Sequence, residues 1–226
     1  MREQVAVRCD QRGRDRVSAE WPTCRCPDSV DSGFRIQPLL RARAAVNPAW
    51  VIRTGRLVLS PVTGSDLPDL RAIKADPAVF AVMLGGVRTY AQTAEDLARD
   101  VIAWGRYGFG WWAVRETNGG RFIGVTGLEH RPDGRGVALR FAVWPEAQGR
   151  GLAREAGFAA LRFGHDKARL PRIVAVARSS NFGSRTILGG IGMREAERFE
   201  QRGYAMILYE SVSSPGNPAT PDCAWP

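Results

Sequence analysis

The residues best suited to chemistry are the six from Gln148 to Ala153, which read Gln-Gly-Arg-Gly-Leu-Ala. Two glycines without Cβ atoms would let a phosphate approach the main chain closely, and Arg150 would add a fixed positive charge beside it. If a helix begins here, its first turn also offers N–H groups without partners and a partial positive charge. The residue types and their spacing therefore predict a site for a pyrophosphate group.

The flanking residues have the pattern of a strand before this loop and of a helix after it. Val137–Val143 is β-branched and aromatic enough to be a buried strand, and Pro145 then ends regular pairing. After the loop, apolar residues recur at the spacing of one helical face: Leu152, Ala156, Ala159 or Ala160, and Phe163. A strand, a glycine-containing turn and a helix would aim several backbone N–H groups at one point.

The loop has three other interpretations. The two glycines could simply form a tight turn, and this alternative stays open. A dinucleotide site would need a third small residue where Arg154 stands and an acidic residue after the next strand, Arg172–Ala177, which is followed by Arg178. A mononucleotide P-loop would need Gly-Lys-Ser or Gly-Lys-Thr, which does not follow. The loop therefore does not match either nucleotide-binding motif.

The pattern Gln148-x-x-Gly151-x-Ala153 resembles the acetyl-coenzyme A loop of the GNAT N-acetyltransferases, which has the form Gln/Arg-x-x-Gly-x-Gly/Ala. The wider order resembles the ribosomal-protein N-terminal acetyltransferase-like branch, through Arg56-Leu57-Val58-Leu59, Asn181-Phe182-Gly183-Ser184 and, more loosely, Ile191-Gly192-Met193. The resemblance spans roughly residues 54–210. It implies an α/β fold of mixed α+β type, with a mixed, mostly antiparallel seven-stranded sheet flanked by helices.

The resemblance also implies where the cosubstrate acetyl-CoA would bind. In GNAT folds it occupies a V-shaped opening between two diverging parallel strands, where the central strand binds the pantetheine arm. The N–H of Val143 would polarise the thioester carbonyl. The implied cofactor-binding set is Phe141, Ala142, Val143, Gln148, Gly149, Arg150, Gly151, Leu152, Ala153, Asn181 and Ser184. Core packing of Phe141 and Val143, and capping of a helix by Asn181 and Ser184, are the structural alternatives.

The catalytic groups are less evident. Many GNAT enzymes have a Tyr where this chain has Leu188, and members of the branch often have a Glu where it has Ala138. The remaining candidates are Glu129 and His130, at the end of the strand expected beside the central one. His130 could serve as a general base because imidazole titrates near neutral pH. The alternative is that both are exposed residues at a hairpin edge.

The lack of an evident general base limits which amines could serve as the acceptor. A lysine side chain with a pKa near 10.4 is only about one part in 2,500 neutral at pH 7, whereas an α-amine near 7.8 is about one part in seven neutral. We therefore expect a primary amine of low pKa as acceptor: the α-amine of a protein or amino acid, or a sugar amine. The alternative function is a non-catalytic acyl-CoA-binding or RNA-associated module on the same fold.

Composition sets further limits. The 226 residues carry a net charge of +9, and residues 51–210 hold 23 basic and 16 acidic residues, a net charge of +7. This charge could attract RNA, but a solvated arginine-rich surface is the favoured explanation, so nucleic acid is not expected as a partner. No apolar run reaches the roughly 18 residues of a membrane span, and the start leads into no apolar segment, so we expect a cytoplasmic protein. Cys9, Cys24, Cys26 and Cys223 lack the spacing of a zinc site, so no metal is expected.

The patterns divide the chain into three parts: a poorly ordered arm at 1–50, the acetyltransferase-like domain at 51–210 and a disordered tail at 211–226. Within the domain, the expected strands are 56–62, 111–116, 121–129, 137–143, 172–177, 195–199 and 204–210. The expected helices are 66–75 with Ser65 as a cap candidate, one from Thr89 or Thr93 to about Trp104, the helix after the loop, and 184–189. A glycine-rich loop is expected at 105–110.

Overall fold

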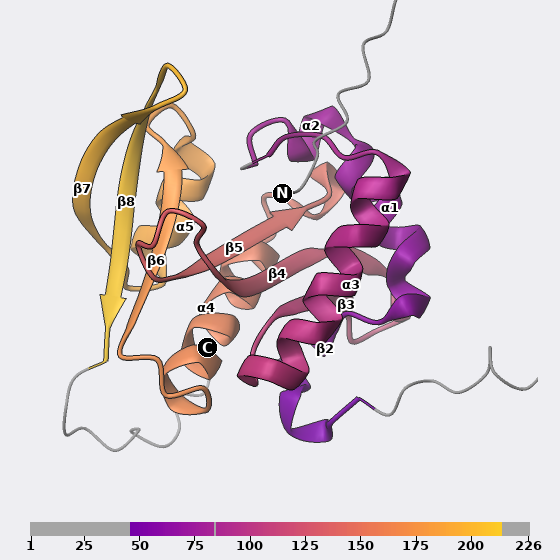
Figure 1. The fold of residues 1–226 in the computed structure, drawn as a ribbon. Helices are drawn as coiled ribbons and strands as arrows, with labels where there is room; N and C mark the ends of the chain where they lie inside the picture. The colour runs from indigo at the N-terminus through magenta and orange to yellow at the C-terminus, as the bar shows by residue number, and fades with distance from the viewer. Residues whose placement is uncertain (1–45, 84, 214–226) are drawn as a thin grey trace, which may run out of the picture. The chain divides into compact units, whose positions relative to one another are not determined.

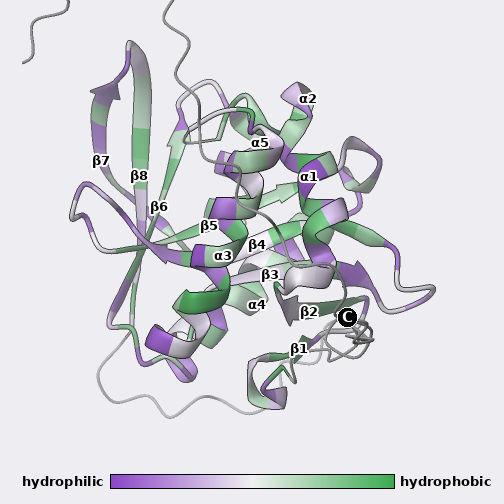
Figure 2. Ribbon diagram, turned by 45° about the vertical axis from the view of Figure 1, so that its right-hand side comes forward, coloured by the Kyte–Doolittle hydropathy of each residue, from purple (hydrophilic) through white to green (hydrophobic). Residues whose placement is uncertain are grey.

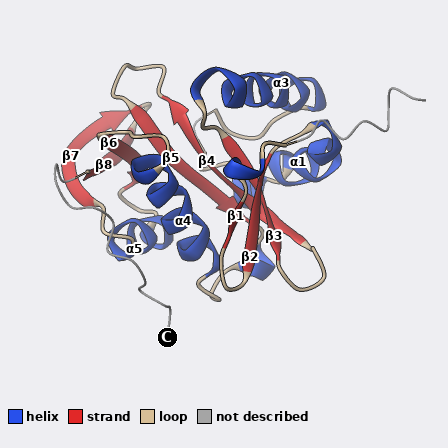
Figure 3. Cartoon of the chain, turned by 90° about the horizontal axis from the view of Figure 1, so that it is seen from below, coloured by secondary structure: helices blue, strands red, loops and turns tan. Residues whose placement is uncertain are grey.

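The fold is built on one twisted sheet with helices on both faces (Figures 1 and 3). A computed structural model describes residues 46–83 and 85–213. The helices are α1 (Leu67–Ala75), α2 (Pro77–Phe80), α3 (Tyr90–Tyr107), α4 (Leu152–Asp166) and α5 (Phe182–Gly190). The strands are β1 (Ile52–Arg53), β2 (Leu57–Pro61), β3 (Trp111–Glu116), β4 (Phe122–His130), β5 (Val137–Val143), β6 (Arg172–Arg178), β7 (Arg194–Gln201) and β8 (Tyr204–Val212).

The strands follow the order β1-β2-β3-β4-β5-β6-β8-β7. Every neighbouring pair is antiparallel except β5 and β6, which are parallel and joined by the crossover helix α4. The expectation of a mixed, mostly antiparallel sheet flanked by helices is confirmed. The described residues form eight strands rather than the seven expected, because the two-residue strand β1 pairs with β2 through Ile52 and Leu59.

Successive side chains of a strand point to opposite faces of the sheet, so the core has one layer on each face. Val137, Leu139 and Val143 of β5 pack in the cluster that contains the apolar residues of α4, such as Leu152 and Ala160. Ala142, on the other face of β5, packs in the cluster of α1 and α2. Figure 3 shows α1 and α3 on one side of the sheet and α4 and α5 on the other. In Figure 2 the central strands are mostly green, whereas β7, whose residues are mostly exposed, carries hydrophilic purple.

Two helix ends differ from the expected positions. Before α1, the backbone N–H of Thr63 donates to Asp66 Oδ2 at 2.8 Å, and a 3-10 turn at Gly64–Asp66 replaces the expected first helical residue. Ser65 therefore does not cap α1. Helix α3 starts at the expected cap Thr89 but continues through the predicted loop to Tyr107, because Gly108 is the residue that adopts the left-handed conformation (φ 72°) that ends it.

The described part of the chain begins before the predicted boundary at residue 51. A 3-10 turn at Pro48–Trp50 places the Trp50 ring 5.1 Å from the Trp104 ring, and Trp112 Nε1 donates to the Trp50 carbonyl at 2.8 Å. Trp50 is therefore partly buried and packs against the core. At the other end of the domain, the last strand extends to Val212. The predictions for residues 1–45 and 214–226, including all four cysteines, lie outside the described residues.

Candidate active site

The two parallel strands diverge after a short paired segment. β5 and β6 pair only at Val137 with Ile173 and at Ala138 with Val174. Beyond these pairs the strands separate, and in Figure 1 β6, β8 and β7 stand apart from β4 and β5 as a second wing of the sheet. A cavity of about 1000 Å³ lies at the opening and is lined by residues of both strands. Every residue of the predicted cofactor-binding set lines this cavity except Arg150.

Pairing with β4 determines which backbone groups of β5 face the opening. The Ala142 carbonyl faces β4, since a Cβ built on Gly124 of β4 would lie 2.2 Å from that oxygen, and the Trp144 N–H donates to the Ile123 carbonyl. Backbone groups of successive strand residues point to opposite edges. Phe141 and Val143 therefore direct their N–H groups toward the opening. Ala142, which was predicted to offer its backbone, contributes only its methyl group.

The predicted loop connects β5 to the N-terminus of α4. Gly149 (φ 72°) and Gly151 (φ 73°) both adopt the left-handed conformation, so the turn itself requires glycine. A Cβ built on Gly149 would meet no atom within 4 Å, so the space in front of the loop is open. Gly151 is the N-cap of α4, whose first-turn N–H groups have no partner within the helix. The tight-turn and anion-binding interpretations thus describe the same geometry.

Arg150 does not face the cavity as the sequence suggested. Its guanidinium Nη2 lies 2.8 Å from Glu116 Oε1, and its carbonyl accepts a hydrogen bond of 2.8 Å from Arg56 Nη1. Arg56 also binds the buried Glu155 carboxylate in the first turn of α4, at 2.6 Å from Nη2 to Oε2. The arginine expected to carry the anion's countercharge therefore belongs to the contacts that hold the loop in place.

Asn181 and Ser184 lie on the opposite wall of the opening, Asn181 just before α5 and Ser184 in its first turn. Asn181 is the N-cap of α5, and its Oδ1 accepts a hydrogen bond of 3.0 Å from the Ser184 N–H. This is the capping arrangement that was the structural alternative. The side-chain N–H₂ of Asn181 and the Ser184 hydroxyl are still available as polar groups beside the cavity.

The cavity also extends to the face of the sheet opposite α4. We call this part, lined by Arg140, Val176, Arg178, Tyr204 and Met206 from the sheet and by α2 residues such as Val79, the α2 half of the cavity. Five arginines line the whole cavity, and among the described residues no carboxylate or lysine does. The sequence interpretation missed this feature, although alternation from Ile173 places Arg178 on the face opposite α4.

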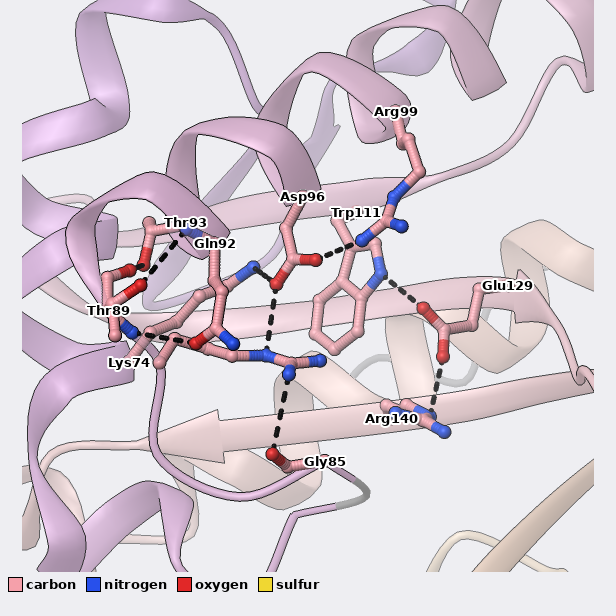
Figure 4. A network of polar contacts seen from close by, with 11 residues as sticks. Lys74, Gly85, Thr89, Gln92, Thr93, Asp96, Arg99, Trp111, Glu129 and Arg140 are labelled. Atoms are coloured by element: carbon pink, nitrogen blue, oxygen red, sulfur yellow. Dashed lines mark hydrogen bonds and ion pairs between the residues drawn. The ribbon is translucent and has the colours of Figure 1, made fainter. Parts of the chain in front are cut away.

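The two predicted catalytic residues lie outside this cavity. Glu129 lies between Trp111 and Arg140 (Figure 4), with its Oε2 accepting from Trp111 Nε1 at 2.9 Å and its Oε1 2.9 Å from Arg140 Nε. The exposed His130 packs against the rings of Tyr107 and Phe109. Both residues pair with the first two residues of β5, away from the end where β5 and β6 diverge. Their arrangement supports a role in packing and charge pairing.

The positions that hold catalytic groups in related enzymes are apolar here. Ala138 and Leu188 are both buried. Tyr209 is also buried, and its hydroxyl donates to Glu195 Oε1 at 3.0 Å. Burial lowers the pKa of Arg140, although Glu129 opposes the shift. Burial also raises the pKa of Asp100 to about 7; Lys74 opposes the rise, and Glu129 and Asp96 add to it.

Comparison with known proteins identifies the family. A family model of the acetyltransferase (GNAT) domain matches residues 56–194. The chain belongs to the GNAT acetyltransferase family. This GNAT protein has the acetyltransferase fold and is an acyl-CoA-dependent acetyltransferase. The resemblance inferred from Gln148–Ala153 and its flanking motifs is confirmed.

Solved structures of similar fold agree with this assignment. A protein from Bordetella pertussis, named as a GNAT-family acetyltransferase, is 26% identical and covers 72% of this chain and 99% of its own, with a TM-score of 0.64. An acetyltransferase from Agrobacterium tumefaciens is 24% identical over 72% of this chain and 94% of its own, with a TM-score of 0.64. A ribosomal L7/L12 alpha-N-protein acetyltransferase in complex with coenzyme A is 15% identical over 72% and 97%, with a TM-score of 0.61. Ribosomal-protein acetyltransferases are thus among the structural neighbours of this GNAT domain.

The described residues contain neither a candidate metal cluster nor a candidate membrane span. Within 46–83 and 85–213, no three or more His, Cys, Asp or Glu side chains are grouped so that they could hold a metal ion. None of the helices in the same ranges combines the length and the apolar character that a membrane crossing requires.

Proposed function

We propose that this GNAT enzyme transfers an acetyl group from acetyl-CoA to a primary amine, with α-amines of peptides or amino acids preferred. The observation that carries the proposal is the cavity between the diverging strands β5 and β6. It joins a glycine loop and a helix N-terminus on one side to the arginine-lined α2 half on the other. Acetyl transfer needs both parts, one to bind the CoA thioester and the other to bind the amine.

The residues present fit acetyl-CoA. The open space before Gly149, the left-handed glycines and the N–H groups of the first turn of α4 suit a pyrophosphate. The free edge of β5 can pair with the pantetheine amides, as an added strand would. A coenzyme A complex of the similarly folded L7/L12 acetyltransferase supports this assignment. Bound acetyl-CoA would supply the thioester carbonyl, and Val143 would donate its N–H to that oxygen.

The charge of the cavity suggests how the amine becomes reactive. An ammonium group cannot attack a carbonyl, so the acceptor must bind in its neutral form. Nearby positive charges disfavour a second positive charge and so lower the pKa of a bound amine. Because arginines and no carboxylates line the described cavity, we propose that the acceptor loses its proton to water on binding. The neutral nitrogen then attacks the carbonyl carbon, the carbon–sulfur bond breaks, the thiolate leaves, and the proton released from the nitrogen passes to water.

A turnover assay tests the proposal against the alternative of a binding-only module. The full chain is mixed with acetyl-CoA and, separately, with N-terminal peptides, aminoglycosides and polyamines, and release of the free thiol is followed. We expect thiol release with α-amines well above the rate of acetyl-CoA hydrolysis without acceptor. Binding of acetyl-CoA with no turnover of any amine in the panel would contradict the proposed function.

A further inference from the structure

We infer that the acceptor of this enzyme carries a carboxylate close to its amine, and that Arg178 recognises this carboxylate. The inference rests on the proposed function and names the substrate class that the α2 half of the cavity would take. The carboxylate could belong to an acidic side chain near a peptide N-terminus or to a free amino acid, since both present the same group beside the amine.

The position of Arg178 and its lack of a counter-ion among the described residues support this assignment. Arg178 is the last residue of β6, at the end where β5 and β6 have separated, and it lines the cavity on the face opposite α4. Its guanidinium lies over the Tyr204 ring, 3.7 Å from the ring centroid, and is partly buried. It forms no ion pair with any described residue. A partly buried charge without a counter-ion is costly unless a ligand supplies one.

Three other arginines that line the cavity, Arg131, Arg140 and Arg202, provide a comparison with Arg178. Arg140 is paired with Glu129, and Arg131 forms an ion pair with Asp133. Arg202, in the turn between β7 and β8, also lines the cavity and forms no ion pair among the described residues. Two arginines are thus available for an anion. A guanidinium matches the planar shape of a carboxylate and can donate two parallel hydrogen bonds.

The proposed position of acetyl-CoA does not account for these charges. Its pyrophosphate is assigned to the glycine loop and the N-terminus of α4, on the other face of the sheet. The α2 wall, which includes Val79, Val82 and Met83, offers no side-chain charge. A carboxylate on the acceptor would therefore be directed to the wall formed by β6 and the β7–β8 turn. The same charges would repel polyamines, which carry several positive groups.

Paired acceptors test the inference with the full chain. Two amidated peptides differ only in having Asp or Asn at the second position, and a second pair is alanine and alaninamide. We expect kcat/KM, expressed per neutral amine because a neighbouring carboxylate raises the pKa of the amine, to be about tenfold or more higher for the acid of at least one pair, as expected for one charge-assisted hydrogen bond. The peptide pair and the amino-acid pair separate the two sources of the carboxylate.

Substitutions test whether Arg178 is the residue that recognises the carboxylate. Arg178→Gln should reduce the preference to less than about threefold while the KM for acetyl-CoA is unchanged, and Arg178→Lys should keep part of it. Arg162→Gln removes the same charge from the surface of α4 and should leave the preference intact. Equal kcat/KM within both pairs for the parent chain, or an unchanged preference in Arg178→Gln, would overturn the inference. Turnover without preference would leave the proposed function standing, whereas no turnover of any amine would contradict both.

Discussion

Arg56 and Glu155 are joined by an ion pair that fastens the first long strand to the first turn of α4. Arg56 Nε and Nη2 lie 2.7 and 2.6 Å from Glu155 Oε2, and Thr54 Oγ1 donates to Oε1 at 2.5 Å. The same guanidinium donates to the carbonyl of Arg150 in the glycine loop. Contacts from residues far away in the sequence thus hold the loop in the shape that the proposed pyrophosphate site requires.

Replacing Glu155 tests the importance of these contacts. The Glu155→Gln variant removes a buried negative charge and leaves Arg56 without its partner, so we expect a loss of about 2 kcal/mol in the free energy of unfolding. The loss stays below the roughly 3–5 kcal/mol of fully buried pairs because Arg56 is half exposed. Urea denaturation measures it. Asp166→Asn breaks the exposed Arg162–Asp166 pair and should cost less than about 0.5 kcal/mol; equal losses would argue against a special role for Glu155.

The glycine loop has a matched control in the β4–β5 hairpin. Gly149 and Gly134 have φ values of 72° and 73°, and a Cβ on either would meet no atom within 4 Å. Glu at either position therefore has a similar backbone cost of about 1–2 kcal/mol. Gly149→Glu should weaken acetyl-CoA binding by at least roughly 100-fold, because it places a carboxylate where the phosphates belong. Gly134→Glu should not; calorimetry showing similar affinities for both variants would contradict the site.

Most of the fold could be predicted because its elements have strong local patterns. Alternation defined β2 to β8 within a few residues, and Thr89 and Gly108 are ordinary helix-end residues. Strand β1 could not be predicted, because two residues carry no period and pair only once β2 is in place. Helix α2 was missed for a similar reason, since its four residues form a single turn after Asp76.

Asp100 should make stability depend on pH. Its pKa is about 7 in the folded protein, against 3.8 for the unperturbed side chain, so the folded state retains a proton that the unfolded state releases. The free energy of unfolding should therefore fall as the pH rises from about 4 to 7, by roughly 2–4 kcal/mol from this group. The Asp100→Asn variant should be more stable than the parent at pH 8 and similar at pH 4.

The control for this prediction is Asp133, whose pKa is lowered to about 2, chiefly by its hydrogen bond with Arg131. This carboxylate is ionised in the folded protein throughout pH 4 to 8 and in the unfolded state above about pH 5, so Asp133→Asn should retain most of the decline in stability over that range. Denaturation curves of the three proteins at pH 4, 6 and 8 give the comparison. A decline of the same size in Asp100→Asn would show that another group causes it.

The start of the domain can be tested by shortening the chain. We propose that residues 46–213 form the folding unit, so a chain beginning at Val46 should unfold cooperatively within a few degrees of the full chain. Removing Trp50 as well leaves the buried Trp112 N–H without its acceptor and removes the ring beside Trp104. We expect the thermal midpoint to fall by about 5–10 °C, from a loss of some 2–3 kcal/mol. Equal midpoints for chains beginning at 46 and 51 would support the predicted boundary at 51 instead.

The site was predictable only in part, because sequence gives the identity of a residue but not its partner. The glycine loop and the central strand were found from local motifs, and they line one cavity as expected. Arg150 was assigned to the phosphate because it lies in the loop, but Glu116 of β3 binds it. Ala142 was assigned by its position beside Val143, whereas pairing with Val125 turns its carbonyl toward β4. The divergence of β5 and β6 depends on how the two parts of the sheet pack, and no local pattern in either strand predicts it.

We propose that this enzyme acetylates an amine of low pKa in a cavity whose described lining residues include no carboxylate. The most direct measurement uses one peptide that carries both a free α-amine and a lysine side chain, incubated with acetyl-CoA and the full chain at pH 7. Fragmentation of the product by mass spectrometry identifies the acetylated nitrogen. We expect acetylation at the α-amine with little at the lysine, whereas equal acetylation of both nitrogens, or acetylation of the lysine alone, would contradict the proposed function.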